Sequence, residues 1–548
     1  MTTVTAPVIP DPRRWKAMAV VALGVSIVIM DATVVNVVLP VLIRDVRLTA
    51  TDAEWTNSIY ALVLAALLIT TGRLGDRFGR RRLLIAGIVI FGLGSVLAAM
   101  ATGAPELLTG RLAQGVGAAA ILPATLSTVN ALFTGRERGI AFAIWGSTIG
   151  GMAAVGPVVG GWLTTAFSWQ WAFLINIPIV IVVLAGAIFW VPETRDEHAV
   201  RGADAPGILL SVVGLSAIVF GLIEGQRLGW WLTSGTPLTF GSLSWSWTVS
   251  PVPFAFLTGV ACIGAFVLHE RSRIRQGRPA LADLRLFGIR SFRFGAIAAL
   301  IVALGEFGML FALPLYLQGA LGYTALNTGV VILALAVGTF LSSGLTPQLT
   351  KRIGARGVVR VGLLLEALSI LALGLTVSET VTPWLVATWL FVYGIGVGLA
   401  TAQLTAVILA EVPVNQSGQA SGLQSTVRQL GSALGVALLG TLLVTSLATS
   451  LSARLESQTT IDGVGRARIV ELVSTSAGAV IPQLDELTGQ TGVRAIAETS
   501  MIGATRVTIL SASAVILLGL IATLALPPVT SRTRRRPAGD KVASATER

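Results

Sequence analysis

Cysteine and histidine are nearly absent from this chain of 548 residues, which has one cysteine, Cys262, and two histidines, His198 and His269. One cysteine cannot form an internal disulfide, and there is no CxxC pair or His/Cys cluster to hold a metal. The sequence also lacks a GxxxxGK[ST] loop, an HExxH motif and a visible Ser/His/Asp arrangement. We therefore expect no enzyme activity, no metal and no cofactor. Energy must then come from an ion gradient, a substrate gradient or a partner.

Charge is also scarce. Only 12% of the residues are charged and 54% are hydrophobic, with a mean hydropathy of +0.80, whereas a soluble protein carries about 25% charged residues. This composition predicts a protein that crosses a membrane many times. The net charge of +12 would favour a nucleic-acid partner in a soluble domain, but here the basic residues fall in short loops between apolar runs. The preference of such residues for the cytoplasmic side explains them, so we expect no nucleic-acid partner.

Long apolar runs account for most of the chain. A bilayer is crossed by a helix of ~20 residues, and runs of that length predict fourteen membrane helices. The first run follows Arg13, Arg14 and Lys16 and contains an acid, Asp31. It exceeds the ~7–15 apolar residues of a secretion signal, so we interpret it as the first membrane helix. The expected spans are approximately 16–40, 54–72, 82–101, 105–131, 138–162, 170–190, 206–223, 252–269, 292–318, 324–348, 357–377, 383–411, 419–449 and 504–526.

The distribution of arginine predicts the orientation of these helices. The loop after the second span, residues 72–82 (GRLGDRFGRRR), carries five arginines between two apolar runs, and basic loops remain in the cytoplasm. The other even-numbered connections are also basic, except that no base lies between Glu411 and Gln419 after span twelve. We therefore expect both termini in the cytoplasm. The excess of arginine over lysine is typical of a GC-rich bacterial genome, so the expected location is the bacterial cytoplasmic (inner) membrane.

The two halves of the sequence resemble each other. LGDRFGRR at 74–81, after the second span, aligns with LTKRIGAR at 349–356, after the tenth, and a GxG motif in the fourth span recurs in the twelfth. Parallel repeats of this kind build transporters from two helix bundles. We expect an all-α polytopic membrane protein with two six-helix bundles and two inserted helices. The expected division is 1–191 for the first bundle, 192–290 for the inserted helices, 291–530 for the second bundle with a long outer loop at 450–503, and 531–548 for a basic cytoplasmic tail.

Two charged residues lie inside apolar runs of the first half. Asp31 is roughly 20 Å into a ~30 Å membrane core, where a carboxylate is costly unless it is paired, hydrated or protonated. Arg111, in the fourth span, lies ~10 Å from the outer face, at about the same depth. We expect the two residues to face each other and to exchange partners as Asp31 takes up a proton. The alternatives are a fixed structural ion pair and an arginine bonded to backbone carbonyls.

Glu306 is the corresponding acid of the second half. Asp31 and Glu306 precede a proline by nine and eight residues respectively, so the repeat places them at similar depth in equivalent helices. We include Glu306 among the proton-coupling residues, the alternative being a glutamate that binds a structural water. Glu224 and Glu366 are left out, because Glu224 lies at the outer end of a span and Glu366 only about two turns from the basic residues at 356–360.

Glycine is concentrated in the fifth span, which closes with GPVVGG at 156–161. Small residues let membrane helices approach closely, and a proline with glycines permits a bend, so this span is expected to pack tightly against a neighbour. Ordinary packing is the alternative for any single glycine. Of the outer segments, 229–250 contains four tryptophans and is expected to be an interfacial anchor, with an aromatic lid as the alternative. Segment 450–503 is expected to form short amphipathic helices.

Together these motifs resemble the major facilitator superfamily, and within it the fourteen-span drug:proton antiporters. Residues 72–82 match the loop signature GxLaDrxGrr, and RLAQGVG at 111–117 resembles the fourth-span signature RxxQGxG. GPVVGG at 156–161 resembles the exporter-associated GPxxGG. MDATVVNVVLP at 30–40 resembles the first-span signature lDxTvvnvxLP, and WQWAFLINIP at 169–178 the start of span six. These motifs cover most of the first half, whereas the second half matches by pattern more than by motif.

The resemblance implies a proton-driven exporter of amphiphilic, often cationic drugs or antibiotics that works by alternating access. It would make Asp31 and Arg111 proton-coupling residues. Residues of the 72–82 loop would latch the two bundles on the cytoplasmic side, and residues of the fifth span would form a helix contact that blocks leakage. The latch residues would be Gly72, Asp76, Arg77, Gly79 and Arg80, and the contact residues Gly156, Pro157, Gly160 and Gly161. The second copy of the loop departs from the pattern, with Lys351 in the place of Asp76.

The expected partners are a small amphiphilic molecule, protons and the lipid bilayer, with a monomer as the working unit and the proton gradient as the energy source. The alternative function is dedicated export of an endogenous lipid or secondary metabolite, which a transport panel would distinguish. The fifth-span motif argues against an importer, and it does so only by analogy with the family. A membrane sensor or enzyme is opposed by the lack of a catalytic cluster.

Overall fold

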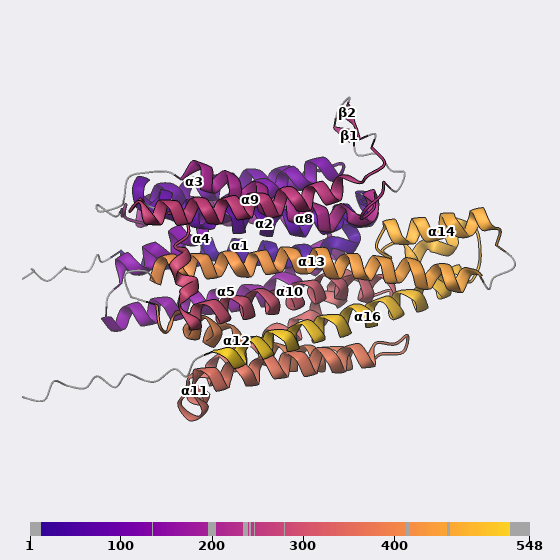
Figure 1. Cartoon of the computed structure of the whole chain (residues 1–548). Helices are drawn as coiled ribbons and strands as arrows, with labels where there is room; N and C mark the ends of the chain where they lie inside the picture. The colour runs from indigo at the N-terminus through magenta and orange to yellow at the C-terminus, as the bar shows by residue number, and fades with distance from the viewer. Residues whose placement is uncertain are drawn as a thin grey trace, which may run out of the picture.

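Long helices that run side by side make up most of the computed structural model (Figure 1). Within the described residues, the only strands are β1 (Thr239–Phe240) and β2 (Leu243–Ser244), which form a small antiparallel hairpin. The all-α architecture predicted from the composition is therefore confirmed. The structure describes residues 13–526 apart from 134, 196–203, 234–238, 241–242, 246, 279, 413–416 and 457–460.

The first half forms six membrane-length helical segments, with α6 and α7 together making the sixth. Local signals fix the turns between them. Thr49 caps α2 in a capping box with Asp52, and Gly79 separates α2 from α3 with φ +113°, a conformation that glycine adopts readily. The helices are α1 (Arg14–Asp45), α2 (Ala50–Phe78), α3 (Arg80–Ala99), α4 (Ala104–Leu132), α5 (Gly135–Ala166), α6 (Trp171–Leu174) and α7 (Asn176–Trp190).

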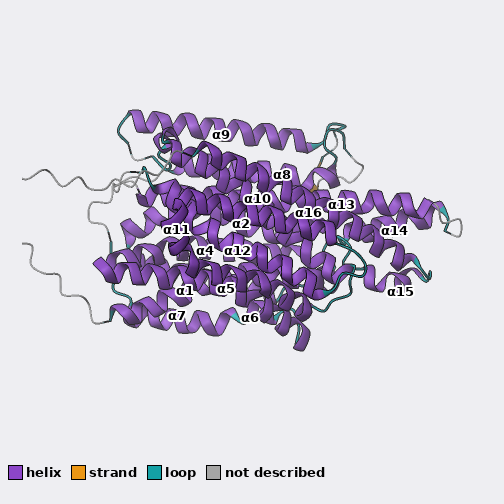
Figure 2. Cartoon of the chain, turned by 90° about the horizontal axis from the view of Figure 1, so that it is seen from below, coloured by secondary structure: helices purple, strands orange, loops and turns teal. Residues whose placement is uncertain are grey.

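Two further helices, α8 (Ala205–Leu228) and α9 (Pro251–Arg275), follow the first half. Asp204 and Ser250 cap them by accepting hydrogen bonds from backbone N–H groups two or three residues further on. Figure 2 shows the pair at one edge of the molecule, where α8 packs against α9, α2 and α13. The inserted helices therefore add to the side of the bundle. The 3₁₀ helix η1 (Leu284–Gly288) then leads into the second half.

The second half contains the remaining membrane helices. Two expected spans are continuous in α11, where Gly354, at φ +75°, introduces a kink. Twelve described segments are long and apolar enough to span a membrane. α2 and α5, with 29 and 32 residues, complete the predicted fourteen. The helices of this half are α10 (Arg290–Gly319), α11 (Ala325–Thr376), α12 (Pro383–Leu409), α13 (Ser417–Glu456) and α16 (Val493–Ala522), which is followed by η4 (Thr523–Ala525).

The described residues of segment 450–503 form short helices, as expected, but the two flanking membrane helices also extend into it. The expected spans end at 449 and begin again at 504, but α13 continues to Glu456 and α16 begins at Val493. Buried apolar residues of this segment, which we call the cap, join the same core as Leu447 and Leu451 of α13, which explains why these helices extend beyond the expected membrane boundary. Between them lie α14 (Gly463–Thr475), η3 (Ile481–Gln483) and α15 (Leu484–Thr488).

Glycine provides the closest helix contacts in both halves. A Cβ added to Gly117 of α4 would lie 2.6 Å from the backbone nitrogen of Phe91 on α3. A Cβ added to Gly396 of α12 would lie 2.8 Å from the backbone nitrogen of Glu366 on α11. The two copies of the GxG motif therefore pack in the same way, each against the helix that precedes it.

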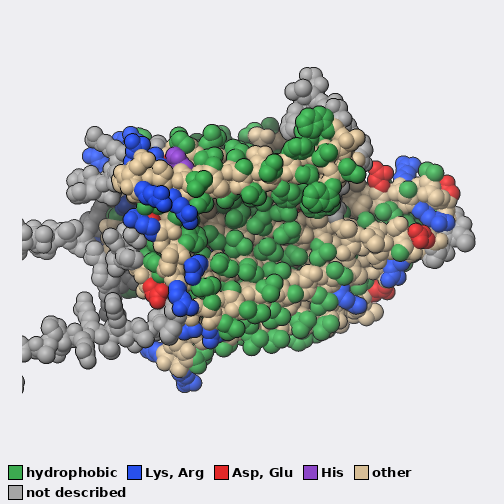
Figure 3. All heavy atoms as spheres, in the orientation of Figure 1, with side chains coloured by type: hydrophobic (Ala, Val, Ile, Leu, Met, Phe, Trp, Pro, Cys, Tyr) green, Lys and Arg blue, Asp and Glu red, His purple; other side chains and the backbone are tan. Residues whose placement is uncertain are grey.

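Charged side chains mark the two ends of the molecule. In Figure 3, apolar side chains cover the middle of the visible face, and Lys and Arg gather at one end. We call this the basic end; α1, α3 and α10 begin there, and α9 ends there. The opposite end, here called the far end, is extended by α14 and the neighbouring parts of α13 and α16 (Figure 1). An apolar band between polar ends is what a membrane-spanning bundle requires.

Candidate functional site

The structure brings Asp31 of α1 and Arg111 of α4 into direct contact. Arg111 Nη1 donates to Asp31 Oδ2 at 2.5 Å, and each side chain is 1% exposed. The other carboxylate oxygen, Oδ1, accepts from the side-chain amides of Gln114 at 2.7 Å and Asn176 at 2.9 Å. Both amides also donate to Ser95 Oγ on α3. Asp31 therefore lies in a buried hydrogen-bond network to which α1, α3, α4 and α7 all contribute.

Arg111 has partners besides Asp31. Its Nε donates to the carbonyl oxygen of Thr56 at 3.1 Å, and its Nη1 donates to Gln114 Oε1 at 2.8 Å. The guanidinium carbon lies 4.4 Å from the centre of the Tyr60 ring, a cation–π contact. These contacts would remain if the charge of Asp31 were removed. Arg111 would therefore stay bonded to groups on α2 and α4 when it loses the carboxylate.

Protonation of Asp31 would force this network to change. The ionised carboxylate accepts three N–H bonds, whereas a protonated acid carries an O–H that must donate. The neighbouring groups that face it are an arginine and two amide NH₂ groups, which are themselves donors. Proton uptake therefore breaks at least one contact between α1 and its neighbours. The arrangement can convert binding of a proton into a change in helix packing.

Glu306, the third predicted coupling residue, lies in the other bundle. It is on α10, where Arg428 Nη2 of α13 lies 3.6 Å from its Oε2. Its side chain is 12% exposed, and that of Arg428 is 36% exposed. The structure thus brings Asp31 and Arg111 together, whereas Glu306 belongs to a separate, more open ion pair.

The fifth-span glycines lie where the two halves meet at the far end. A Cβ on Gly161 of α5 would overlap the carbonyl of Ala325 on α11, and a Cβ on Gly329 of α11 would overlap the carbonyl of Pro157 on α5. Each substitution would place a carbon closer than 3.0 Å to backbone atoms, a separation that real contacts essentially never show. The α5–α11 contact therefore depends on glycine on both sides.

The other glycines of this motif face the first helix. A Cβ on Gly156 would overlap Thr33, and a Cβ on Gly160 would lie 2.7 Å from a side-chain carbon of Val34. α5 is thus packed between α1, which carries Asp31, and α11 of the second half. A change in the packing of α1 would reach the contact between the halves through this helix.

The predicted latch residues lie at the basic end, along the first bundle. Arg80 Nη1 donates to the carbonyl of Ser127 on α4 at 3.3 Å. Gly72 lies beside Pro123 of α4, Gly79 lies beside the Glu193 carboxylate, and the Arg77 guanidinium is 4.9 Å from the Phe78 ring centre. The side chain of Asp76 lies outside the described residues. A latch between the bundles stays a prediction.

A family model described as the Major Facilitator Superfamily matches residues 21–436, well over half of the chain. This chain belongs to the Major Facilitator Superfamily. The match runs from α1 through the inserted helices and into α13 of the second bundle. The fold class and the family resemblance predicted from the sequence are therefore confirmed.

Among curated members of the superfamily, several drug resistance and export proteins are similar to this chain. The puromycin resistance protein pur8 of Streptomyces alboniger is 37% identical over 421 residues, which cover 75% of this chain and 78% of that protein. The probable actinorhodin transporter of Streptomyces coelicolor is 33% identical over 75% of this chain and 69% of that protein. The multidrug efflux pump LfrA of Mycolicibacterium smegmatis is 33% identical over 75% and 77% of the two chains.

Among solved structures, the inward-facing and occupied form of a bacterial homologue of the human lysosomal transporter Spinster is similar to this superfamily member. The TM-score is 0.59 with 18% sequence identity, and the likeness covers 94% of this chain and 97% of that chain. At this identity the likeness supports the fold. It agrees with the helix order described above.

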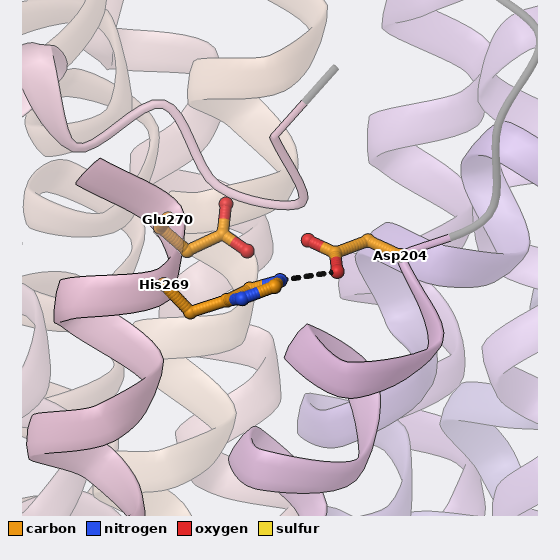
Figure 4. A group of neighbouring side chains, drawn as sticks. All are labelled: Asp204, His269 and Glu270. Carbon is orange, nitrogen blue, oxygen red and sulfur yellow. Dashed lines mark hydrogen bonds and ion pairs between the residues drawn. The ribbon is translucent and has the colours of Figure 1, made fainter. Parts of the chain in front are cut away.

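The described part of this superfamily member contains one group of residue types that bind metals, Asp204, His269 and Glu270, at the basic ends of α8 and α9 (Figure 4). His269 Nε2 lies 2.8 Å from Asp204 Oδ1, and Arg273 Nε lies 3.3 Å from Asp204 Oδ2. The charge of Arg73 on α2 also acts on both acids. Two guanidinium groups thus already balance the two carboxyl groups, so we interpret the cluster as an ionic clasp between helices.

The pKa of Asp204 reflects this role. Burial would raise the pKa of its carboxyl group, but hydrogen bonds from Glu270, His269 and the Gly207 N–H, together with the charge of Arg273, hold the pKa below its usual value. Glu270 also accepts from the N–H of Ala282, in the segment that leads to the second half. The clasp therefore joins the inserted helices to the connection between the bundles.

Two tryptophans of the segment before α9 are exposed. Trp231 and Trp247 are 76% and 61% exposed, as an anchor in the headgroup layer would be. Trp230 instead lines a surface groove of about 620 Å³ along α13, with Leu438, Thr441, Leu442, Thr445 and Thr449. No residue of the Asp31 network lines this groove, so it is separate from the site described above.

Sequence reasoning missed the neutral partners of Asp31. Gln114 and Asn176 stand inside the motifs that carry the family resemblance, but an amide in an apolar span costs less than a charge and gives no sign of its partner. Two buried acids were also missed, Glu54 on α2 and Glu366 on α11, which are 3% and 1% exposed. Glu366 stands inside an apolar span, which was the available signal, whereas Glu54 stands at the start of the expected second span, two residues after Asp52.

We expect the two amides to stabilise the network around Asp31. Replacing Gln114 by Met or Asn176 by Leu removes a hydrogen bond to the buried carboxylate. A hydrogen bond to a charged group contributes about 1.5–3 kcal/mol, so each variant should lower the free energy of unfolding by about that amount in a thermal unfolding assay. Thr128→Val, which removes a buried hydroxyl elsewhere on α4, should cost less, because that hydroxyl bonds a neutral carbonyl. Equal losses in the three variants would contradict this role of the amides.

Proposed function

We propose that this protein exports amphiphilic, often cationic small molecules, such as drugs or antibiotics, from the bacterial cytoplasm in exchange for protons. The observation that carries the proposal is the fully buried Asp31–Arg111 pair, whose network cannot accommodate a protonated Asp31 without rearranging. Ionisable groups of this kind inside a membrane bundle are typical of proton relays. The resistance and export functions in the names of its relatives support drug-like substrates.

In this proposal the far end faces outside and the basic end faces the cytoplasm. The α5–α11 contact then closes the outer side, and substrate enters from the cytoplasm. The loaded protein opens to the outside while Asp31 is ionised. Uptake of a proton there by Asp31 releases Arg111, changes the packing of α1 against α5, and thereby returns the protein to the state in which the outer contact is closed. The proton then leaves to the cytoplasm. The 72–82 loop would latch the bundles on the cytoplasmic side in the opposite state. The working unit would be a monomer in the inner membrane with both termini inside, and it would use the proton gradient without a cofactor.

Efflux from proteoliposomes tests the proposal. Purified protein is reconstituted with ethidium at equal concentration inside and outside the liposomes, and a pH gradient is imposed with acid on the side that corresponds to the cell exterior. We expect ethidium to leave against its concentration gradient, and to stop leaving when a protonophore collapses the pH gradient. Efflux that continues unchanged without the pH gradient would contradict proton exchange.

Dedicated export of a secondary metabolite is the second candidate function. The names of two relatives favour it: the probable actinorhodin transporter, and the tetracenomycin C resistance and export protein of Streptomyces glaucescens, which is 28% identical over 74% of this chain. A panel of ethidium, puromycin and an aromatic polyketide distinguishes the two. A multidrug exporter moves all three compounds, whereas a dedicated exporter moves the polyketide alone.

A further inference from the structure

The second bundle holds a polar cluster at the position that Asp31 occupies in the first. The two copies of the repeated loop begin at Leu74 and Leu349, a spacing of 275 residues, and Glu306 follows Asp31 at the same spacing. Both acids lie roughly 25 Å along helices that start at the basic end. Glu306 therefore stands in the equivalent helix and at the equivalent depth.

The cation of this cluster comes from a different helix. The two GxG motifs, in α4 and α12, are 279 residues apart in the sequence. At the same spacing, Tyr393 of α12 corresponds to Gln114 of α4, and Leu390 corresponds to Arg111. An apolar side chain thus replaces the buried guanidinium. The positive charge is supplied by Arg428 of α13, which is 36% exposed and 3.6 Å from Glu306. This pairing is looser than the 2.5 Å contact of Asp31.

A second acid, Glu366 of α11, lies in the same cluster. The backbone nitrogen of Glu366 lies against Gly396, as the backbone nitrogen of Phe91 lies against Gly117 in the first bundle. The second bundle therefore carries a carboxyl group where the first bundle carries an apolar ring. Glu366 is 1% exposed, and its charge interacts with those of Glu306 and Arg428. Glu366 Oε2 and Tyr393 Oη are buried without a hydrogen-bond partner among the described residues.

The balance of charge in this cluster requires a further positive partner. Two carboxyl groups share one half-exposed guanidinium, and two neighbouring buried carboxylates cannot both remain ionised. The groups that face Glu366 are Glu306 from α10, Tyr393 from α12 and Arg428 from α13. α16 also packs on α11, and its Ser513 donates to the backbone carbonyl of Ala367 and brings no charge. A proton is the smallest cation that meets this need in an apolar bundle.

We propose that Glu306 and Glu366 form a second proton site, so that each exported molecule is exchanged for two protons, one bound by Asp31 and one by the glutamate pair. This inference rests on the proposed function. The proton adds to a carboxylate oxygen from the outer side and leaves that oxygen towards the cytoplasm, so only an O–H bond forms and breaks. Asp31 remains the residue on which the change of state depends, because only there does protonation release a fully buried arginine.

The proton stoichiometry of ethidium transport tests this inference. Proteoliposomes carry an imposed ethidium gradient, the membrane potential is clamped at zero with potassium and valinomycin, and the opposing pH gradient is varied until net flux stops. A tenfold ethidium gradient is balanced by about 0.5 pH unit with two protons and by about 1 pH unit with one, because a pH unit and a tenfold concentration ratio represent the same free energy. The variants are Glu366→Gln, Glu306→Gln and, as a control, Glu379→Gln, which changes an exposed glutamate after α11.

The inference predicts a balance point near 0.5 pH unit for the wild type and Glu379→Gln, and near 1 for Glu366→Gln and Glu306→Gln. Glu366→Gln or Glu306→Gln with the wild-type balance point would overturn the role of the pair, as would a wild-type balance point near 1. Both results leave the proposed function standing, because flux still responds to the pH gradient. If the wild type shows no flux that responds to the pH gradient, the proposed function fails, and this inference fails with it.

Discussion

Asp31→Asn is expected to reduce efflux driven by a pH gradient to the rate of protein-free liposomes. The variant keeps the shape of the side chain but cannot gain or lose a proton, so the network around Arg111 is fixed in one state and the cycle cannot return. The measurement is the initial rate of ethidium efflux from proteoliposomes at equal protein content. Asp45→Asn, at the exposed end of the same helix, should retain the wild-type rate.

Loss of folding has to be separated from loss of coupling in this variant. Removing one partner of a buried ion pair leaves an uncompensated charge and lowers the free energy of unfolding by about 3–5 kcal/mol. The double variant Asp31→Asn with Arg111→Gln removes both charges, so it should recover much of that stability in a thermal unfolding assay. It should still not couple efflux to the pH gradient. A double variant with wild-type coupled efflux would assign the pair a structural role alone.

Gly161→Val is expected to prevent closure of the far end. The added side chain would overlap the Ala325 carbonyl of α11, which can be relieved only if α5 and α11 move apart. Overpacking of this kind costs about 1–3 kcal/mol, enough to shift the balance between two conformations roughly 5- to 150-fold. Efflux should fall accordingly, and an imposed pH gradient should collapse faster than in liposomes with the wild type.

The matched control for this prediction lies on the same helix. Gly151 of α5 has open space at the position of an added Cβ, so Gly151→Val tests the effect of valine in α5 without the overlap. It should retain efflux and hold the pH gradient. Equal behaviour of Gly161→Val and Gly151→Val would show that the α5–α11 contact does not control closure.

The sequence was sufficient to predict the ion pair because charge in an apolar span has few explanations. Asp31 and Arg111 could be matched by depth alone, since a helix rises a fixed distance per residue and each residue could be counted from the end of its own span. The amides of Gln114 and Asn176 could not be assigned to Asp31 in this way. Which face of a helix meets which neighbour is decided by packing between helices, and neutral side chains leave no trace of it in hydropathy.

Glu366 shows where the depth argument fails. Its short distance from Arg360 suggested a position near the membrane surface, but Arg360 donates to the carbonyl of Thr523, at the start of η4 after α16. A long basic side chain can begin below the surface and extend to it, so a base in the sequence marks the boundary only to within about a turn or two. The extended ends of α13 and α16 were missed for a related reason, since the cap that buries them lies outside the membrane.

Release of protons on substrate binding tests the central claim most directly. Ethidium is added to weakly buffered, purified protein at the pH where efflux is half-maximal, and released protons are recorded with a pH indicator. The account predicts that the wild type releases protons as the dye binds, and that Asp31→Asn, at equal dye occupancy, releases fewer protons per dye because one titrating carboxyl group is gone. Equal release by the two proteins, or no release by the wild type, would contradict it.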